Sequence, residues 1–371
     1  MKQKAIVTLP ITPRENPKLG LMFIPFIMDV LSKRIGIEQV LGLNVHGLKL
    51  IDKNAEEQVL GYIKEIVNLG ITPDFIWRDD QNENVYWINK FFRKLVANGY
   101  IIKDNRLIMC CPCKAVETLS SAGNASPKKR LYDDKVTYMR CKVCRGIVTQ
   151  ELKAVYLFKI PRFQLSSNLI FPNFLQKEIS NTAKKFAGVE LLISRSRPSA
   201  ISLWTGKEHI FLDVDFGWQL YLPMLRRYGY DPVVLIGSQE NLFGCYLALL
   251  LLHLVDTRTT ALVVPAYCRE KQTDNAVLNS FKNWDKNITR LFLASHITFR
   301  RKETYWDSSL IGLIKAVVNN LHEHEIPVLY QELQEVLNTC EGSKVRQLLS
   351  MARSKGKFDD LLVNLIRKEK I

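Results

Sequence analysis

The stretch LPITPRENPKLGL, at residues 9–21, decides the fold. An apolar run of β type at residues 5–9 leads into it. An amphipathic helix is expected at residues 23–33, opened by Gly20 and carrying Asp29. A strand, a turn that brings backbone near a ligand and a helix N-terminus aimed at the same place form the usual geometry of a nucleotide site. We therefore predict a phosphate-facing turn here.

Short apolar strands and helices alternate along the rest of the chain. Helices are expected at residues 54–68 and 84–98, and the second ends at Gly99, a typical C-cap. A short strand is expected within residues 40–50, ending at Asn44-Val45-His46-Gly47. This alternation predicts a parallel α/β sheet, and everything after residue 283 is expected to be helical. Further strands are expected at residues 210–213, 232–236 and 261–265, and further helices at residues 221–228 and 242–254.

Composition limits the class of protein. A chain of 371 residues exceeds one typical domain, so we expect one main domain with appended modules. The longest apolar run, residues 245–255, is too short to span a bilayer, and no secretory signal is evident. Eight cysteines, four of them in CxxC pairs, suit a reducing cytosol better than a disulfide framework. We expect a cytoplasmic protein that binds neither membrane nor DNA.

The formal net charge of +15 favours a polyanionic partner, and tRNA or another RNA would fit. The alternative is a basic isoelectric point with no such partner. The last segment, residues 344–370, is basic and could contact phosphates. A charged, solvated helix face is the alternative interpretation of that segment.

A turn-rich segment interrupts the α/β pattern and carries two cysteine pairs. Cys110 and Cys113 form one, and Cys141 and Cys144 form the other. Four thiolates in paired knuckles give the closed tetrahedral site that zinc prefers, and a full ligand set predicts a structural zinc. Four buried free cysteines are the alternative, and Cys111 could replace Cys110. The single cysteines Cys245, Cys268 and Cys340 are expected in the core.

Several segments, in order along the chain, together resemble class I aminoacyl-tRNA synthetases of the methionyl type, with leucyl-type features as well. The resemblance covers roughly residues 5–320. It is carried by Lys18-Leu19-Gly20-Leu21 at the HIGH signature, Asn44-Val45-His46-Gly47 at the D-x-HG segment, residues 211–218 (FLDVDFGW) at the WLDAPIGY segment, Ile236-Gly237 at the start of IGKD, and residues 269–275 near the EKMSKS loop.

The resemblance implies a Rossmann-type parallel sheet split by a zinc-ribbon connective insert and followed by a C-terminal helical region. The expected boundaries are residues 1–108 and 161–282 for the two halves of the catalytic domain, 109–160 for the insert and 283–371 for the helical region with its basic tail.

The resemblance also implies a nucleotide site that would hold ATP. Its expected residues depart from the family pattern, because Leu21 replaces a histidine, Gln239 an aspartate and Asp274 a lysine. Losing one preorganised transition-state donor typically costs about 2.7–4 kcal/mol, so ordinary adenylation should be slow. The nucleotide-binding candidates are Lys18, Gly20, Gly237, Gln239 and Lys271.

The implied amino acid pocket has changed as well. Asp215 stands where the family has proline, and a carboxylate suits a cationic group better than a methionine side chain. Asp215 could orient an amine or act as a base, with His46 as the second candidate; a solvent-facing or capping Asp215 and a packed His46 are the alternatives. The substrate-binding candidates are Leu9, Ile11, Asn44, Phe211, Asp215, Trp218 and Gly244, and the catalytic candidates are Lys18, Lys271, Asp215 and His46.

Two functions are compatible with these residues. The first is a diverged synthetase-like enzyme that acts on an aminoacyl-adenylate or on the acceptor end of an aminoacyl-tRNA without charging methionine. Acyl transfer to an amine needs only an oriented amine, a base and oxyanion donors, and cyclodipeptide synthases are a precedent by analogy. The second is a non-catalytic protein that binds a small molecule or RNA.

Overall fold

The structure is a computed structural model. It describes residues 2–49, 54–119, 136–137, 140–141, 143–196, 201–269, 281, 284–297, 303–308, 310–312 and 314–315. The strands are β1 (Gln3–Thr8), β2 (Glu38–Leu43), β3 (Phe75–Arg78), β4 (Ile101–Cys110), β5 (Glu117–Leu119), β6 (Val136–Thr137), β7 (Arg140–Cys141), β8 (Thr149–Lys159), β9 (Ile170–Phe171), β10 (Glu190–Leu192), β11 (Ser194–Arg195), β12 (Ile201–Trp204), β13 (His209–Leu212), β14 (Tyr230–Ile236), β15 (Ala261–Val263), β16 (Tyr267–Arg269) and β17 (Glu303–Tyr305). The helices are α1 (Leu19–Ile35), α2 (Val45–Lys49), α3 (Ala55–Asn68), α4 (Asn82–Ala97), α6 (Leu175–Phe186), α7 (Val214–Gly217), α8 (Tyr221–Leu225), α9 (Leu242–Asp256) and α11 (Lys286–Ala294), with 3-10 turns η1 (Ser167–Leu169), η2 (Trp218–Leu220), η3 (Arg226–Tyr228) and η4 (Gln239–Asn241).

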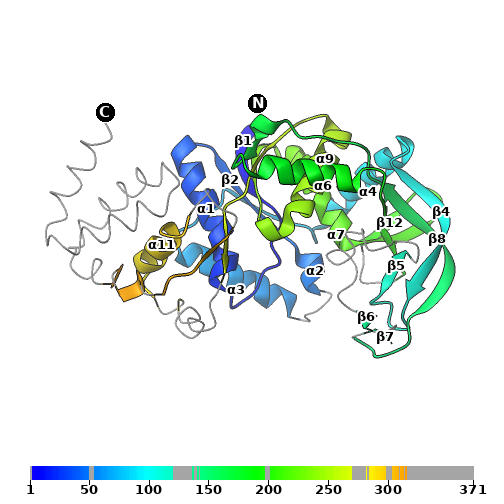
Figure 1. Ribbon diagram of the computed structural model, residues 1–371, viewed down its shortest axis with the longest axis horizontal. Helices are drawn as coiled ribbons and strands as arrows, with labels where there is room; N and C mark the ends of the chain where they lie inside the picture. Colours follow the sequence, from blue (N-terminus) through cyan, green and yellow to red (C-terminus); the bar gives the residue numbers. More distant parts are fainter. Residues whose placement is uncertain are drawn as a thin grey trace.

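A six-stranded sheet forms the centre of the molecule, with strand order β3-β2-β1-β14-β15-β9 (Figure 1). All of its strand pairs are parallel. The chain order runs outward from β1 to β2 and β3 on one side, and β14 and β15 lie on the other side. The strand order therefore reverses between β1 and β14, which makes a crevice at their carboxyl ends the expected ligand site. The predicted parallel α/β sheet is confirmed.

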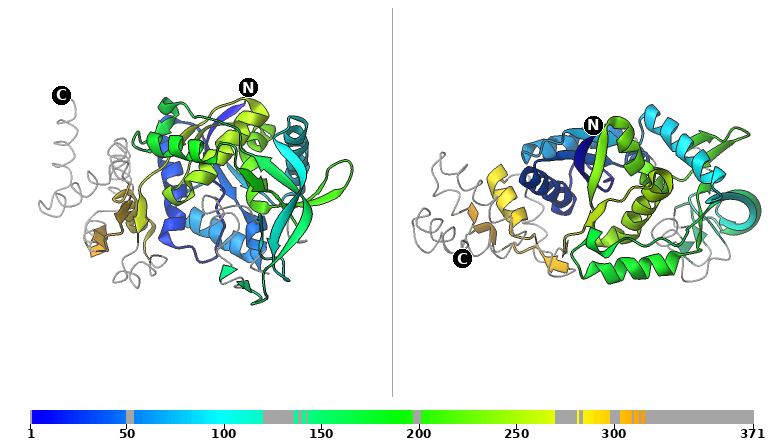
Figure 2. Two further views of the ribbon diagram at one scale, coloured as in Figure 1. Left: turned by 45° about the vertical axis from the view of Figure 1, so that its right-hand side comes forward. Right: turned by 90° about the horizontal axis from the view of Figure 1, so that it is seen from above.

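Helices cover both faces of this sheet (Figure 2). Ile6 of β1 packs in one hydrophobic core with residues of α1, α3 and α11. Its neighbours Ala5 and Val7 point to the opposite face and pack with α4, α6, α8 and α9. This alternation is what a strand buried on both faces requires. The predicted helix at residues 242–254 is confirmed as α9, which is apolar almost all round and lies in the second core.

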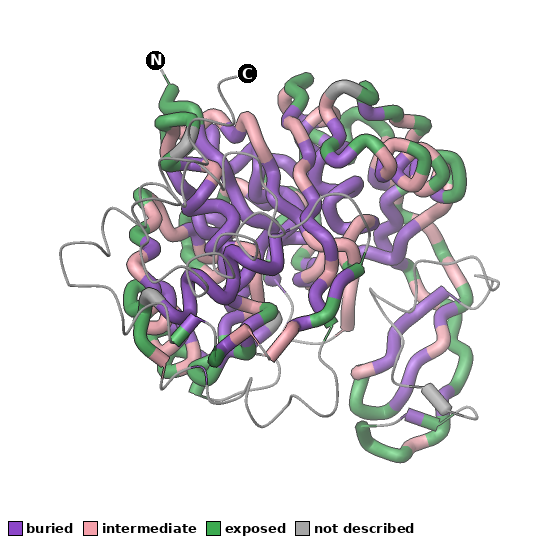
Figure 3. Tube along the Cα trace, turned by 60° about the vertical axis from the view of Figure 1, so that its left-hand side comes forward, coloured by how far each residue is buried: buried purple, intermediate pink, exposed green. Residues whose placement is uncertain are grey.

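An antiparallel sheet of order β10-β8-β4-β5 interrupts the parallel one. Strands β4 and β8 pair from Ile101 with Phe158 to Cys110 with Thr149, and they form a long arm that carries the cysteine knuckles. Buried residues gather in the body of the molecule, whereas buried, intermediate and exposed residues are mixed along the arm (Figure 3). The domain boundaries expected from the sequence stay predictions.

The short strand expected within residues 40–50 is β2, which ends at Leu43, directly before Asn44. The helix α2 follows because the buried carboxylate of Asp79 accepts the amide protons of Val45 and His46 at 2.6 and 2.9 Å. One local expectation was wrong. The segment after residue 283 is not entirely helical, because β17 pairs in parallel with β16. None of the described helices is long and apolar enough to cross a bilayer.

Candidate functional site

A cavity of about 860 Å³ lies at the carboxyl ends of β1 and β14, where the strand order reverses. Its walls come from the loop after β1, the first turns of α1, the segment after β14 and the segment between β15 and β17. This size is within the range of ligand pockets, about 300–1,000 Å³. The crevice expected from the strand order therefore holds a cavity large enough for a nucleotide.

The N-terminus of α1 opens into this cavity. Lys18 is the N-cap residue in an extended conformation, and the first turn of α1 contains no acidic residue. Both Lys18 and Gly20 line the cavity, and a Cβ added at Gly20 would meet nothing within 4 Å. The free amide groups and dipole of a helix start favour an anion, and the Lys18 side chain adds a positive charge.

The end of β14 forms the opposite wall. A Cβ on Gly237 would lie 2.3 Å from Sγ of Cys245 on α9, so only glycine allows the strand end to approach the helix this closely. Gln239 follows on η4, lines the cavity and is half-buried. Its Nε2 atom is buried and has no hydrogen-bond partner among the described residues.

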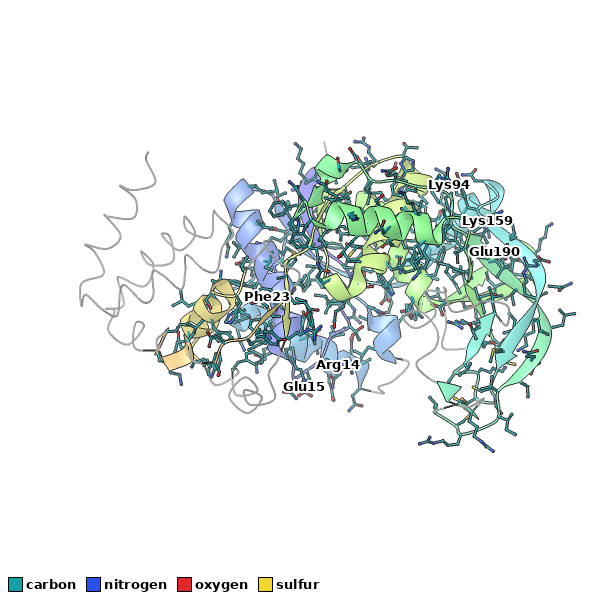
Figure 4. All side chains as sticks on the ribbon, in the orientation of Figure 1. Arg14, Glu15, Phe23, Lys94, Lys159 and Glu190 are labelled. Carbon is teal, nitrogen blue, oxygen red and sulfur yellow. The ribbon has the colours of Figure 1, made fainter. Side chains whose placement is uncertain are left out.

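The third wall contains residues that the sequence did not single out as site residues. Arg269 ends β16 and pairs with Glu303 of β17, with Nη2 2.6 Å from Oε1. Trp306, just after β17, is almost fully buried and packs edge-on against Phe23 of α1 at 5.4 Å between ring centroids. Figure 4 labels Phe23. Arg269 is a second cation beside the cavity, and its position after the expected strand at 261–265 was the available sequence signal.

Four of the predicted nucleotide-binding residues meet at this cavity, together with two of the predicted substrate-binding residues. The first four are Lys18, Gly20, Gly237 and Gln239, and the other two are Leu9 and Ile11. Lys271 and Asp274 lie outside the described residues. The other candidates, Asn44, His46, Phe211, Asp215, Trp218 and Gly244, do not line the cavity.

A path of contacts nevertheless joins the cavity to several of these other candidates. The backbone of Ile11 accepts the amide proton of Asn44 at 2.9 Å, which puts Asn44 beside the cavity wall. His46 follows on α2, and α2 packs against α7, which carries Asp215. Asp215 is half-buried, and its Oδ1 accepts the indole proton of Trp218 at 3.3 Å. The α2–α7 contact is therefore next to the cavity without opening into it.

Asp215 is held in place by a buried ion pair. Oδ1 of Asp213, the N-cap of α7, accepts the amide proton of Asp215 at 2.9 Å. The other carboxylate oxygen of Asp213 pairs with Arg195 of β11, which also donates to the backbone carbonyl of Glu117 on β5. These contacts connect the cysteine-bearing insert to the wall beside the cavity.

Four cysteines converge at the tip of the arm. The Sγ atoms of Cys111, Cys113, Cys141 and Cys144 lie within 4.8 Å of one another. A Zn–S distance of about 2.3 Å places the sulfurs of a tetrahedral site about 3.8 Å apart, and the sulfurs of Cys113 and Cys141 are 3.8 Å apart. The arrangement therefore fits a zinc ion.

The backbone is shaped for this cluster. Lys114 and Arg145, each directly after the second cysteine of its pair, adopt positive φ angles of 56° and 60°. The backbone amide of Gly146 hydrogen-bonds to Cys144 and, together with Cys113, lowers the pKa of the Cys144 thiol to about 7. Burial raises the pKa of the neighbouring Cys113 thiol to about 12, so of this pair Cys144 is the one that readily supplies a thiolate in the absence of a metal.

The prediction that Cys110 belongs to this cluster is corrected to Cys111, the alternative considered from the sequence. Cys110 is the last residue of β4, and its Sγ lies 4.0 Å from Oγ1 of Thr149 on the paired strand. Cys110 therefore faces the paired strand β8, and the sulfur of Cys111, the first residue after β4, faces the other three cysteines.

Comparison with solved structures defines the class of fold. The parallel sheet with its cysteine-bearing insert is the fold of a class I aminoacyl-tRNA synthetase. More particularly, it is similar to methionyl-tRNA synthetase of Mycobacterium tuberculosis. The structure with bound methionyl-adenylate has a TM-score of 0.62 and 14% sequence identity, over 86% of this chain and 69% of that chain.

Two further structures of the same synthetase agree. A second methionyl-adenylate complex has a TM-score of 0.62 and 14% identity, over 97% of this chain and 80% of that chain. The free form has a TM-score of 0.60 and 14% identity, over 86% and 67%. No family model and no curated protein matches the sequence. The likeness therefore concerns the fold.

Proposed function

We propose that the cavity binds an aminoacyl-adenylate or the aminoacyl-adenosine end of a charged tRNA, and that the protein acts on the aminoacyl group without charging methionine. The observation that carries this proposal is the cavity at the carboxyl ends of β1 and β14, with Lys18 and Arg269 beside it. Similar structures of Mycobacterium tuberculosis methionyl-tRNA synthetase hold methionyl-adenylate.

Each part of such a ligand has a suitable environment. The α1 N-terminus and Lys18 suit a phosphate, and Gln239 offers an amide to a ribose or base. Ile11 and Asn44 lie between the cavity and the α2–α7 contact. Because this contact does not open into the cavity, side chains there would have to move to admit an aminoacyl group. Asp215 would orient an amine there, and His46 is the second candidate for a base.

Two residues of the cavity wall give a reason to expect weak ATP chemistry. Leu21 lines it where the resemblance implies a histidine, and it has no donor to stabilise developing charge on a phosphate. Gln239 lines it where the resemblance implies an aspartate, so a carboxylate is missing from the nucleotide side. Transfer of an acyl group that is already activated therefore fits the cavity better than its activation by ATP.

Zinc at the knuckles is part of the proposal. Cys111, Cys113, Cys141 and Cys144 would hold it, and a closed set of four thiolates gives it a structural role. It would fix the tip of the arm, where Glu117 of β5 pairs with Cys110 and its backbone carbonyl accepts a hydrogen bond from Arg195, the partner of Asp213.

A non-catalytic binding protein is the second candidate, favoured by the apolar Leu21 in the cavity wall. The two are separated by activity measurements on the purified protein. ATP–pyrophosphate exchange across the common amino acids and consumption of aminoacyl-tRNA are measured in parallel. Turnover in either assay supports an enzyme. If neither assay shows turnover, the enzyme hypothesis is refuted.

A further inference from the structure

The exposed face of α4 carries a stripe of aromatic and basic side chains. Tyr86, Lys90 and Arg93 follow one another at intervals of three or four residues, so they lie on one face of the helix. All three are exposed, and Tyr86 has 59% of its surface accessible. The helix lies along the outer edge of the molecule, away from the cavity (Figure 2). This face is therefore open to a partner.

A second aromatic residue stands at the far end of the stripe. Nη2 of Arg93 donates a hydrogen bond to the backbone carbonyl of Trp204 on β12 at 2.8 Å. The Trp204 indole is 44% exposed and lies 4.9 Å from the ring of His209. From Tyr86 to Arg93 the helix advances about 10 Å. An exposed aromatic residue thus stands at each end of the segment that carries the two cations.

The ring of Trp87, next to Tyr86 on α4, brings a third cation, Arg227, close to Lys90. The ring lies 5.0 Å from Nζ of Lys90 and 4.8 Å from the guanidinium carbon of Arg227. Cation–π contacts of this kind hold the two charges close together despite their repulsion. The fixed position of these cations suits a partner with regularly spaced negative charges.

No neighbouring carboxylate among the described residues neutralises these cations. Among the described residues, no ion pair involves Lys90, Arg93 or Arg227. The one acid in α4 is Glu83, in the first turn of the helix, and the hydroxyl of the nearby Tyr228 donates to Oδ1 of Asn84 at 2.8 Å. Glu208, on the hairpin beside Trp204, is paired with Lys103 at 2.5 Å.

We propose that this surface, made of Tyr86, Lys90, Arg93, Arg227 and Trp204, binds a single-stranded polynucleotide. Exposed aromatic rings stack on bases, and cations between them contact the phosphates. A duplex, whose bases are already stacked, cannot use the two aromatic rings. None of these residues lines the cavity, so the inference is independent of the proposed aminoacyl chemistry.

Fluorescence anisotropy of labelled oligonucleotides tests the charges. The probes are poly-A RNA, poly-T DNA and an RNA duplex, each about 12 nucleotides long, which is within known site sizes. The wild type should bind the single strands more tightly than the duplex. Lys90→Gln/Arg93→Gln should weaken single-strand binding at least about tenfold and lower the slope of log affinity against log salt by about 1.4 between about 50 and 200 mM salt.

A matched control removes the same charge elsewhere. Lys177 and Lys184 are exposed on α6, and Lys177→Gln/Lys184→Gln should change affinity less than about twofold. An equal loss in this control and in the α4 variant would contradict a specific surface. So would the absence of oligonucleotide binding at about 50 mM salt, which would instead indicate an acidic protein as the partner.

Aromatic variants test stacking. Trp204→Ala and Tyr86→Ala should each weaken single-strand binding at least about fivefold without affecting the duplex, and Trp204→Phe should retain most of the affinity. Unfolding curves identify any variant that loses the fold. If Trp204→Ala is unfolded, the result for Tyr86→Ala decides the test. Unchanged single-strand affinity in folded aromatic variants, or equal binding of duplex and single strands by the wild type, would overturn the proposal. RNA and DNA single strands are both supporting ligands.

Discussion

Arg290 on α11 donates from Nη2 to the fully buried carboxylate of Asp29 on α1 at 2.8 Å. Its Nη1 atom donates to the backbone carbonyl of Leu69, at the end of α3, also at 2.8 Å. One guanidinium therefore joins three helices on the face of the sheet that carries the α1 N-terminus. Lys33 contacts the other oxygen of Asp29 at 2.7 Å, but its side chain is 41% exposed.

Arg290→Ala should therefore destabilise the protein by about 3–5 kcal/mol, because it removes the main partner of a buried charge. Lys33→Gln removes a cation from the same carboxylate and should cost less than about 1 kcal/mol, since water can replace an exposed partner. The measurement is the free energy of unfolding in urea. Similar losses for the two variants would contradict this account of Asp29.

The knuckle prediction compares two adjacent cysteines. Cys111→Ser should reduce the zinc content of the purified protein well below one equivalent, because it removes one of four converging ligands. Cys110→Ser should keep a full equivalent. The measurement is elemental analysis by mass spectrometry. Zinc loss in Cys110→Ser with retention in Cys111→Ser would restore the CxxC pair that the sequence indicated.

The close approach of β14 to α9 gives a third prediction. Gly237→Ala places a methyl group 2.3 Å from Sγ of Cys245 and should cost about 1–3 kcal/mol of stability. Gly237→Ala/Cys245→Ala should recover part of this loss, because the sulfur is removed. Gly20→Ala, within α1 where space is open, is the control and should not lower the free energy of unfolding; it should raise it by up to about 1 kcal/mol, because alanine favours the helix. A double variant no better than the sum of the two single ones would show that the contact is not limiting.

Local periodicity was sufficient to predict much of the fold. The apolar residues of α9 and the helical spacing in α3 and α4 identified these helices, since each is determined by residues close in sequence. The helical conformation of Val45 and His46 could not be predicted in this way. It depends on Asp79, whose carboxylate lies 33 and 34 residues further along the chain.

The candidate site was predictable only in part, for the same reason. Lys18 and Gly237 follow strands whose carboxyl ends meet, so their convergence could be inferred from the order of elements. Trp306 could not, because its position requires β17 to pair with β16 across residues 270–302. The choice between Cys110 and Cys111 depended on where β4 ends, which sequence patterns rarely fix within one residue.

The most direct test of the central claim is calorimetric titration with non-hydrolysable aminoacyl-sulfamoyl adenosines, one for each common amino acid. At least one analogue should bind with saturation. Lys18→Gln should weaken that binding at least about tenfold, as expected for the loss of a charged hydrogen bond, and Lys64→Gln on the exposed face of α3 should not. Binding by none of the analogues, or equal binding by the Lys18 variant, would contradict the assignment of this cavity to an aminoacyl-adenylate ligand.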